Sequence, residues 1–474
     1  MNKRIGVLHY RSTARTRLRS ILPAMKDSFP KMGMQTKTSL AAGLLLLFAG
    51  AGTACAQTHW VGSWTAAQQL PEPQNSLAAD DLRDATLRQV VHLSLGGTEL
   101  RVHLSNRFGS APLHFASVHI ARLASSPSGA IDVSTDKTLT FSGRPDATVP
   151  AGAEYVSDPA AFPVVALSDL AITIHFDVAP SGQTGHPGSR ATSYLAHGDL
   201  VSTAQLPEPK KIEHWYFISG VDVAALPQAV AVVTLGDSIT DGHGSTTDGN
   251  NRWPDLLAKR LQADPATRTV AVLNAGIGGN RLLLDGLGPN ALARFDRDVI
   301  APASIRCVIV LEGVNDLGML ARESDVASAA HEALVRSILS AYEQIVTRAH
   351  AHGIQAIGAT ILPFTGSLFY HPGPATEADR QAINQWIRAP GHFDVLLDFD
   401  KVMRNPEHPG SLLPAFDSGD HLHPSPAGYA AMAEAVPLSW FTSVSSPADS
   451  APQQRQLPFP PRAAPGAQFE ALCR

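Results

Sequence analysis

The sequence predicts an antiparallel β-sandwich followed by a three-layer α/β/α domain with a parallel sheet. From about residue 57 to 225, apolar and polar residues alternate with a period of two, and helical patterns are almost absent. From 226 to 444, short apolar runs alternate with longer segments of helical periodicity. Alternation is typical of half-buried antiparallel strands, whereas apolar runs between helices indicate a parallel sheet.

The first 56 residues are expected to lie outside both domains. The apolar run 40–50 follows Lys31 and Lys37, is too short to span a bilayer, and precedes an Ala-Cys-Ala tripeptide that ends at Ala56. This pattern predicts a secretory signal peptide cleaved near Gln57, and hence a secreted or periplasmic protein. Acylation of Cys55, as in a lipoprotein, is the weaker alternative.

The charge of the remaining chain excludes two classes of partner. The segment 1–56 contains nine Lys or Arg and one Asp. Without them, the 37 basic and 42 acidic residues of the whole chain become 28 and 41, a net charge of about −13. Nucleic acids and anionic membranes bind cationic surfaces, so neither is an expected partner, and no stable membrane insertion is expected after cleavage.

The β-region is expected to form a sandwich of jelly-roll type. Alternating residues on both sides of Gly96-Gly97, within 87–109, predict a hairpin. Further strands are expected at 113–123, 137–142 and 170–178. Capping or orienting the second domain is the favoured role of the sandwich, and sugar binding is the alternative.

The α/β region is expected to contain five strand–helix units. One helix is expected from Trp253 to Leu261, and a longer one from Asp325, as N-cap, to His352, closed by Gly353. Such a sheet binds ligands at the carboxyl ends of its strands. The Pro- and Ser-rich tail 445–474 is predicted to be disordered. The strands are expected at 229–235, 269–274, 306–312, 354–362 and 393–397.

Four short blocks lie just beyond strand ends or in the last loop. They are GDSIT at 236–240, NAGIGGN at 274–280, EGVND at 312–316 and DHLHP at 420–424. Together, over about 215 residues, they resemble the SGNH, or GDSL-type, hydrolase superfamily, which is named for a serine, a glycine, an asparagine and a histidine in these blocks. The N-terminal GSWTAAQ, 62–68, also resembles the leading domain of secreted bacterial esterases of this group.

The resemblance implies a serine esterase that needs no metal or cofactor. Ser238 would be the nucleophile and His423 its base, and Asp420 would orient the imidazole. The backbone N–H groups of Ser238 and Gly278 and the Asn315 side chain would bind the oxyanion. The GxSxG elbow of the unrelated α/β-hydrolases is absent.

Other residues of these blocks have competing interpretations. Gly276–Gly279 lacks the spacing of a dinucleotide loop. His421 and His423 form too small a ligand set for a metal, and none is predicted. Asp316 is expected to support Asn315. Asp237 is expected to hold the turn, with contact to the substrate as the alternative.

Substrate-facing residues are expected from two loops. Phe369 and Tyr370 would line the acyl or alcohol pocket, whereas His186 and Arg190, in a loop of the sandwich, would either face the site or staple that loop. Cys307 lies in an apolar strand pattern and is expected in the core.

The expected substrate is a small-molecule or polysaccharide ester. Short-chain acyl groups, such as acetyl esters of plant polysaccharides, are favoured. A lysophospholipid or aryl ester, acyl transfer to a sugar alcohol, and a non-catalytic carbohydrate-binding protein are the alternatives.

Overall fold

The computed structural model describes residues 58–442, which belong to one compact unit. The predicted signal peptide and the predicted disordered tail lie outside the described residues. Among the helices of residues 58–442, none combines the length and the apolar character that crossing a membrane requires.

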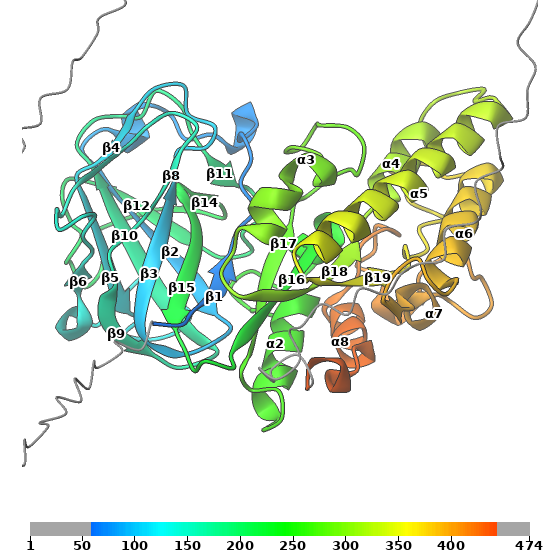
Figure 1. Ribbon diagram of the computed structural model, residues 1–474. Coiled ribbons are helices and arrows are strands. Elements are labelled where there is room, and N and C mark those ends of the chain that lie inside the picture. The colour runs from blue at the N-terminus through cyan, green and yellow to red at the C-terminus, as the bar shows by residue number, and fades with distance from the viewer. Residues whose placement is uncertain (1–57, 443–474) are drawn as a thin grey trace, which may run out of the picture. The chain divides into compact units, whose positions relative to one another are not determined.

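The first part is a pair of antiparallel sheets, as predicted (Figure 1). In its core, the rings of Phe115, Phe176 and Phe217 pack against one another with centroids 5.2–6.2 Å apart, and none of the three is exposed. One sheet has the order β1 (Trp60–Thr65), β15 (Ile218–Ala224), β3 (Gly97–Ser105) and β8 (Glu154–Val156), and β9 (Ala160–Val164) also pairs with β3. The other has the order β13 (Lys210–Ile212), β12 (Ser193–His197), β2 (Ala85–Leu93), β10 (Ser168–Phe176), β5 (Ser117–Arg122) and β6 (Lys137–Thr138).

Short elements complete this part of the chain. The two-stranded pairs are β11 (Gly185–His186) with β14 (Trp215–Tyr216), and β4 (Leu113–Phe115) with β7 (Ala147–Val149). The 3₁₀ helices are η1 (Pro73–Asn75), η2 (Asp80–Leu82) and η3 (Val133–Thr135).

The prediction of a hairpin around Gly96-Gly97 is wrong. The strands β2 and β3 form as predicted, but they belong to different sheets. The segment that connects β2 to β3 runs beside β1 instead, because the N–H and the Oγ of Ser94 both donate to Ser63 O, at 2.9 and 2.6 Å. A Cβ at Gly96 would lie 2.7 Å from Val164 O, so the glycine allows a close backbone approach and not a tight turn.

The second part is a five-stranded parallel sheet with helices, as predicted. Its order is β17 (Val270–Gly276), β16 (Val230–Gly236), β18 (Ile305–Leu311), β19 (Gln355–Ala359) and β20 (Val395–Leu397). Every residue of β16 is buried, which explains its unbroken apolar run. The chain leaves β16 for β17 on one side and continues to β18 on the other. A ligand site is therefore expected where these strands end.

The helices pack in two groups, α2 with α7 and α8, and α3 to α6 with one another, as in a three-layer α/β/α domain (Figure 1). The long helix begins at Ser328 with Ala327 at the N-cap, because Asp325 takes a left-handed φ of 56°. The expected N-cap is therefore wrong, although Gly353 does follow the helix end with φ 68°. The helices are α1 (Ser238–Asp241), α2 (Trp253–Ala263), α3 (Ala291–Phe295), η4 (Asp296–Ile300), α4 (Val314–Ala321), α5 (Ser328–Ala351), α6 (Pro374–Arg388), α7 (Phe399–Met403), η5 (Pro414–Phe416), α8 (Pro426–Ala435) and η6 (Leu438–Phe441).

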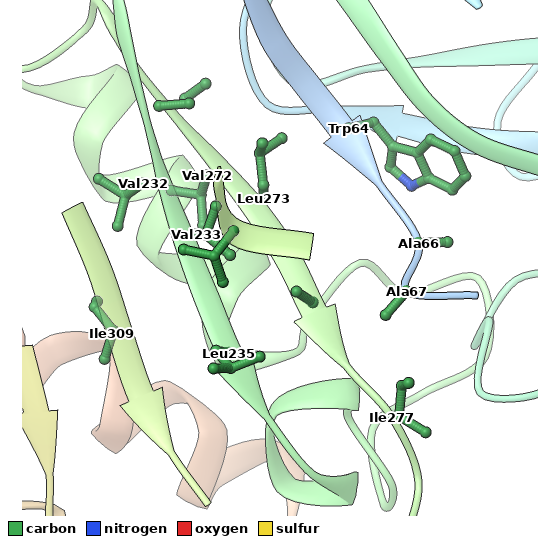
Figure 2. Packing of buried hydrophobic residues seen from close by; sticks show 14 of the residues in the cluster. Trp64, Ala66, Ala67, Val232, Val233, Leu235, Val272, Leu273, Ile277 and Ile309 are labelled. Atoms are coloured by element: carbon green, nitrogen blue, oxygen red, sulfur yellow. The ribbon is translucent and has the colours of Figure 1, made fainter. Parts of the chain in front are cut away.

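Strand β1 joins the two parts by packing against β17, the edge strand of the parallel sheet. Figure 2 shows Trp64 of β1 and the apolar side chains of β16 and β17, among them Val233 and Leu273. The Gly62 N–H donates to Ala303 O at 3.1 Å, and Ser304 Oγ donates to Trp60 O at 2.8 Å.

Cys307, on β18, is buried as expected, and burial raises the pKa of its thiol to about 12. At that pKa the sulfur stays protonated at neutral pH, which fits a packing role.

Candidate active site

Ser238 stands where the central strand turns into a helix. β16 ends at Gly236, and Ser238 is the first residue of α1. Asp237 is the N-cap, and its carboxylate accepts the Ile239 N–H at 2.9 Å. The turn packs tightly against β17, because a Cβ at Gly276 would lie 2.3 Å from the Asp241 nitrogen. The serine hydroxyl is thereby fixed at the carboxyl end of the sheet.

A hydrogen-bonded chain links Ser238, His423 and Asp420. Ser238 Oγ lies 2.8 Å from His423 Nε2, although 185 residues separate them, and His423 Nδ1 lies 2.5 Å from Asp420 Oδ2. The other oxygen, Asp420 Oδ1, accepts the His423 N–H at 2.8 Å. A carboxylate accepts from Nδ1–H and leaves Nε2 free to accept the serine proton. This geometry can turn the hydroxyl into a nucleophile.

The charge on Asp420 is stabilised by the same contacts. Burial alone would raise the pKa of this carboxyl group. The hydrogen bonds from the His423 imidazole and from the backbone N–H groups of His423 and Leu422 outweigh burial and hold the pKa below its usual range. Asp420 is therefore ionised at neutral pH and acts as the acceptor for His423.

Three hydrogen-bond donors gather beside Ser238. Neither the Ser238 N–H nor the Gly278 N–H donates to another group of residues 58–442. Asn315 Nδ2 donates to Asn280 O at 2.7 Å, and Asn315 Oδ1 accepts from the Tyr370 hydroxyl at 2.6 Å. These two bonds orient the amide and leave its second N–H for another acceptor. Ser238, Gly278 and Asn315 all line the same cavity, as donors for one oxyanion must.

A fully buried arginine braces the strand ends beneath the serine. The Arg294 guanidinium donates to Gly236 O at 3.0 Å and to Ala275 O at 2.6 Å, which are carbonyl groups at the carboxyl ends of β16 and β17. It also donates to Glu312 at 3.2 Å and Asp298 at 3.0 Å. Burial, and then the neighbouring Asp237, raise the pKa of Glu312 well above its usual range. This arginine network holds in place the strand ends from which the site projects.

Asp316 supports a different residue from the one expected. Its two carboxylate oxygens accept the backbone N–H groups of Leu282 and Leu283, at 2.8 and 3.1 Å. Burial raises its pKa to about 6 despite these two bonds. Asp316 therefore fixes the loop that follows Gly278, whereas Asn315 is held by Asn280 and Tyr370.

The cavity above Ser238 has a volume of about 790 Å³, within the range of small-molecule sites. Its walls differ in character. The sandwich contributes mainly polar side chains, and the α/β part contributes apolar ones. The polar wall includes Gln69, Glu72, Asn75, Arg190 and His214, and the apolar wall includes Leu287, Leu368, Phe369, Tyr370 and Leu422.

Of the five expected substrate-facing residues, three line this cavity: Arg190, Phe369 and Tyr370. Asp237 does not, because it is buried and caps the turn, so the alternative interpretation of Asp237, contact with the substrate, is corrected. His186 is buried as well: Nδ1 donates to Ala67 O at 2.8 Å and Nε2 faces Asp241 Oδ1 at 2.9 Å. The second interpretation of His186, a staple, matches this placement.

Sequence reasoning missed His243. It follows the first block by three residues, in a Gly-His-Gly stretch, and its ring lies 4.1 Å from that of His423, centroid to centroid. The Arg190 Nη2 donates to His243 Nδ1 at 3.3 Å. Burial, and then the charges of His423 and Arg190, lower the pKa of His243 to about 4. The ring is therefore neutral at the pH where an imidazole base would act.

His243, Asp420 and His423 also have the donor types of a metal site, with ligand atoms within 4.8 Å of one another. The sequence suggested His421 and His423 as the possible ligand pair. His421 is not part of this cluster, because its ring bonds to Asp417 and its side chain is 52% exposed. Both ring nitrogens of His423 already serve Ser238 and Asp420. A metal would have to displace one of these two bonds.

The fold and this constellation define a class of protein. A serine, a histidine and a carboxylate in one hydrogen-bonded chain, above the end of a parallel sheet and beside three oxyanion donors, are the parts of a serine hydrolase. Residues 234–431 match the GDSL-like lipase/acylhydrolase family. Residues 234–431, the α/β part of the chain, are thereby assigned to the SGNH/GDSL superfamily of carboxylic ester hydrolases.

Several solved structures are similar to a little under half of the chain. A protein described as a lipolytic member of the G-D-S-L family from Desulfitobacterium hafniense is 24% identical, with coverage of 45% of this chain and 99% of that one and a TM-score of 0.32. A GDSL-like lipase from Bacteroides thetaiotaomicron is 22% identical (46% and 93% covered, TM-score 0.31). An acetyl xylan esterase is 20% identical (44% and 97% covered, TM-score 0.32). No curated protein matches the chain.

Proposed function

We propose that the protein is an exported serine esterase that works through an acyl-Ser238 intermediate. The single observation that carries the proposal is the continuous contact from Ser238 Oγ to His423 Nε2, at 2.8 Å, and from His423 Nδ1 to Asp420 Oδ2, at 2.5 Å. His423 takes the serine proton as Oγ attacks the ester carbonyl.

The negative charge that develops on the carbonyl oxygen would be received by the three donors. They are the backbone N–H groups of Ser238 and Gly278 and the free N–H of Asn315. The protonated His423 then gives its proton to the leaving alcohol, and water, activated by the same imidazole, releases the acid from Ser238. No step in this sequence needs a metal or a cofactor.

Short-chain acyl esters of carbohydrates, including acetyl esters of plant polysaccharides, are the proposed substrates. The polar wall of the cavity supports this proposal, because Gln69, Asn75 and His214 offer groups that hydrogen-bond to hydroxyls. Aryl esters are the second candidate. The exposed Leu368 and Phe369, at 75% and 59%, favour them, because an aromatic group would cover this apolar surface.

The test is turnover of p-nitrophenyl acetate and of acetylated xylan by the chain without residues 1–56, compared with Ser238→Ala. We expect the wild type to release acetate from both and the variant to lose at least 10³-fold in kcat. Equal rates for the two proteins would refute the serine mechanism. Rates on esters with acyl groups from acetyl to octanoyl then distinguish a site that accepts only short acyl groups from one that also accepts long ones.

Export is a separate proposal, with its own measurement. The signal-like segment 1–56 supports cleavage near Gln57. Cell fractionation and N-terminal sequencing of the native protein test it. A cytoplasmic protein that retains residue 40 would refute it.

A further inference from the structure

We propose that Arg190 binds an anionic oxygen group, a carboxylate or a phosphate, on the alcohol part of the ester. This inference rests on the proposed function, because the proton transfers of His423 define the alcohol side of the cavity.

The first step places the alcohol. The leaving oxygen must lie next to His423 Nε2, because this imidazole returns the proton to it. The ring of His243 lies against His423, and Arg190 donates to His243 at 3.3 Å. Arg190 therefore stands on the side of the cavity where the alcohol leaves.

The second step is the lack of a counter-charge. Among residues 58–442, Arg190 forms no ion pair, and its Nε is buried without a hydrogen-bond partner. A buried guanidinium N–H without an acceptor is costly, so such a group marks a place where a ligand can supply one. The Arg190 side chain also lines the cavity, so its guanidinium lies beside the space that a bound molecule would fill.

None of the neighbouring carboxylates forms an ion pair with the Arg190 side chain. Asp248, whose backbone N–H donates to Arg190 O, accepts the N–H and the Oγ1–H of Thr192, both at 2.7 Å. Asp420 accepts from His423, and Asp241 Oδ1 pairs with His186 at 2.9 Å, whereas Asp241 Oδ2 has no hydrogen-bond partner among the described residues. Glu72, the other acid of the lining, accepts from the amides of Gln69 and Asn75, both at 2.8 Å. Arg190 is thus the only cation of the lining, among the described residues, that lacks an anionic partner.

The third step concerns the backbone. Arg190 has a left-handed φ of 49°, which is uncommon for a residue with a side chain and often marks a functional constraint. The loop holds this conformation and directs the guanidinium to His243. Since a guanidinium matches the two oxygens of a carboxylate or a phosphate, the recognised group has that chemistry.

The experiment compares three acetyl esters of one phenol framework: 4-acetoxybenzoate, 4-acetoxyphenyl phosphate and the neutral 4-acetoxybenzamide. The acyl group is constant, so only the alcohol side differs. The measured quantity is kcat/KM for each anionic ester divided by that for the amide, after correction for their rates of alkaline hydrolysis.

We expect the wild type to prefer at least one anionic ester by about tenfold or more at low ionic strength. Arg190→Asn, which tolerates the left-handed backbone, should lower this ratio to near one, and Arg190→Lys should keep part of it. The matched control is Arg144→Asn, in the same sandwich, where the arginine is 73% exposed and pairs with Asp146. Its ratio should equal that of the wild type.

A wild-type ratio near one overturns the inference, whether or not the Arg190 variants fold. So does an equal fall of the ratio in Arg190→Asn and Arg144→Asn. Preference for the carboxylate over the phosphate, or the reverse, identifies the source of the charge. Hydrolysis of all three esters that survives Ser238→Ala would instead refute the proposed function, so the two failures are distinguishable.

Discussion

Tyr370 shows how a single hydroxyl can position an oxyanion donor. Its O–H donates to Asn315 Oδ1 at 2.6 Å, and both side chains are buried. This bond orients the Asn315 amide so that its nitrogen, and not its oxygen, faces the developing charge. Tyr370 is a positioning residue in this arrangement.

We therefore expect Tyr370→Phe to lower kcat with little change in KM. Loss of one neutral hydrogen bond is worth about 1 kcal/mol, or about fivefold in rate. Asn315→Ala, which removes a donor itself, should cost about 10²–10³ in kcat. Steady-state kinetics of both variants on p-nitrophenyl acetate provide the measurement. A Tyr370→Phe enzyme with unchanged kcat would show that Asn280 alone orients the amide.

The ionisation of Asp420 links the site to stability. Its pKa is lowered in the folded protein from 3.8. A carboxyl group whose folded pKa is depressed adds stability above its unfolded pKa, and this stability is lost as the pH falls through the folded value. Because the side chain is 42% exposed, the contribution is modest.

The matching prediction compares the thermal midpoint of the wild type with that of Asp420→Asn between pH 3 and pH 7. The wild type should be the more stable protein above about pH 4–5, and the difference should begin to shrink below pH 4, where Asp420 protonates in the unfolded chain but stays ionised in the folded protein. A difference that stays constant over this range would mean that the charge of Asp420 does not contribute.

At the scale of the elements, the site depends on how closely α1 approaches β17. A Cβ at Gly276 would lie 2.3 Å from the backbone nitrogen of Asp241, so the strand and the turn could not both keep their places. The glycine is required by this contact between elements that the sequence separates by more than 30 residues.

Gly276→Ala should therefore destabilise the fold by about 1–3 kcal/mol and lower kcat, since Ser238 lies on the displaced turn. Urea unfolding and kinetics measure the two effects. Gly373→Ala is the matched control, because its Cβ would contact nothing within 4 Å and its φ is −94°. Similar losses in the two variants would argue against a specific steric effect at position 276.

The elements themselves were largely predictable. The five parallel strands occur at the expected places because strands of a parallel sheet that is covered on both faces, such as the fully buried β16, leave apolar runs in the sequence. The partners of β2 and β3 were not predictable, since a period of two shows that one face of a strand is buried but not which strand lies beside it. The N-cap of α5 was also wrong, because Asp325 takes a turn conformation three residues before the helix begins.

At the scale of the whole molecule, a buried pair connects the sandwich to the α/β part. His186 Nδ1 faces a carbonyl, which only accepts, so this nitrogen carries a hydrogen. The contact with Asp241 at 2.9 Å then holds a second hydrogen, on either the imidazole or the carboxyl group. Both side chains are at most 3% exposed. Removing one partner leaves the other buried without its hydrogen-bond partner.

A double-mutant cycle tests this connection. His186→Ala and Asp241→Ala should each cost about 3–5 kcal/mol in the free energy of unfolding, and the double variant should cost at least about 1 kcal/mol less than their sum. Urea unfolding of the four proteins gives the coupling energy. Additive effects would show that the two residues stabilise the protein independently.

The sequence by itself determined the fold class and the four blocks that carry Ser238, Gly278, Asn315 and the Asp420–His423 pair. These are local signals: periodicity reports which face of an element is buried, and a block reports the chemistry of one loop. Only the tertiary structure decided which strands pair, that Asp237 lies beneath the site, and that His243 and Arg190 meet beside His423. The physical reason is that such contacts join residues from distant loops, and their geometry depends on the packing of the whole core.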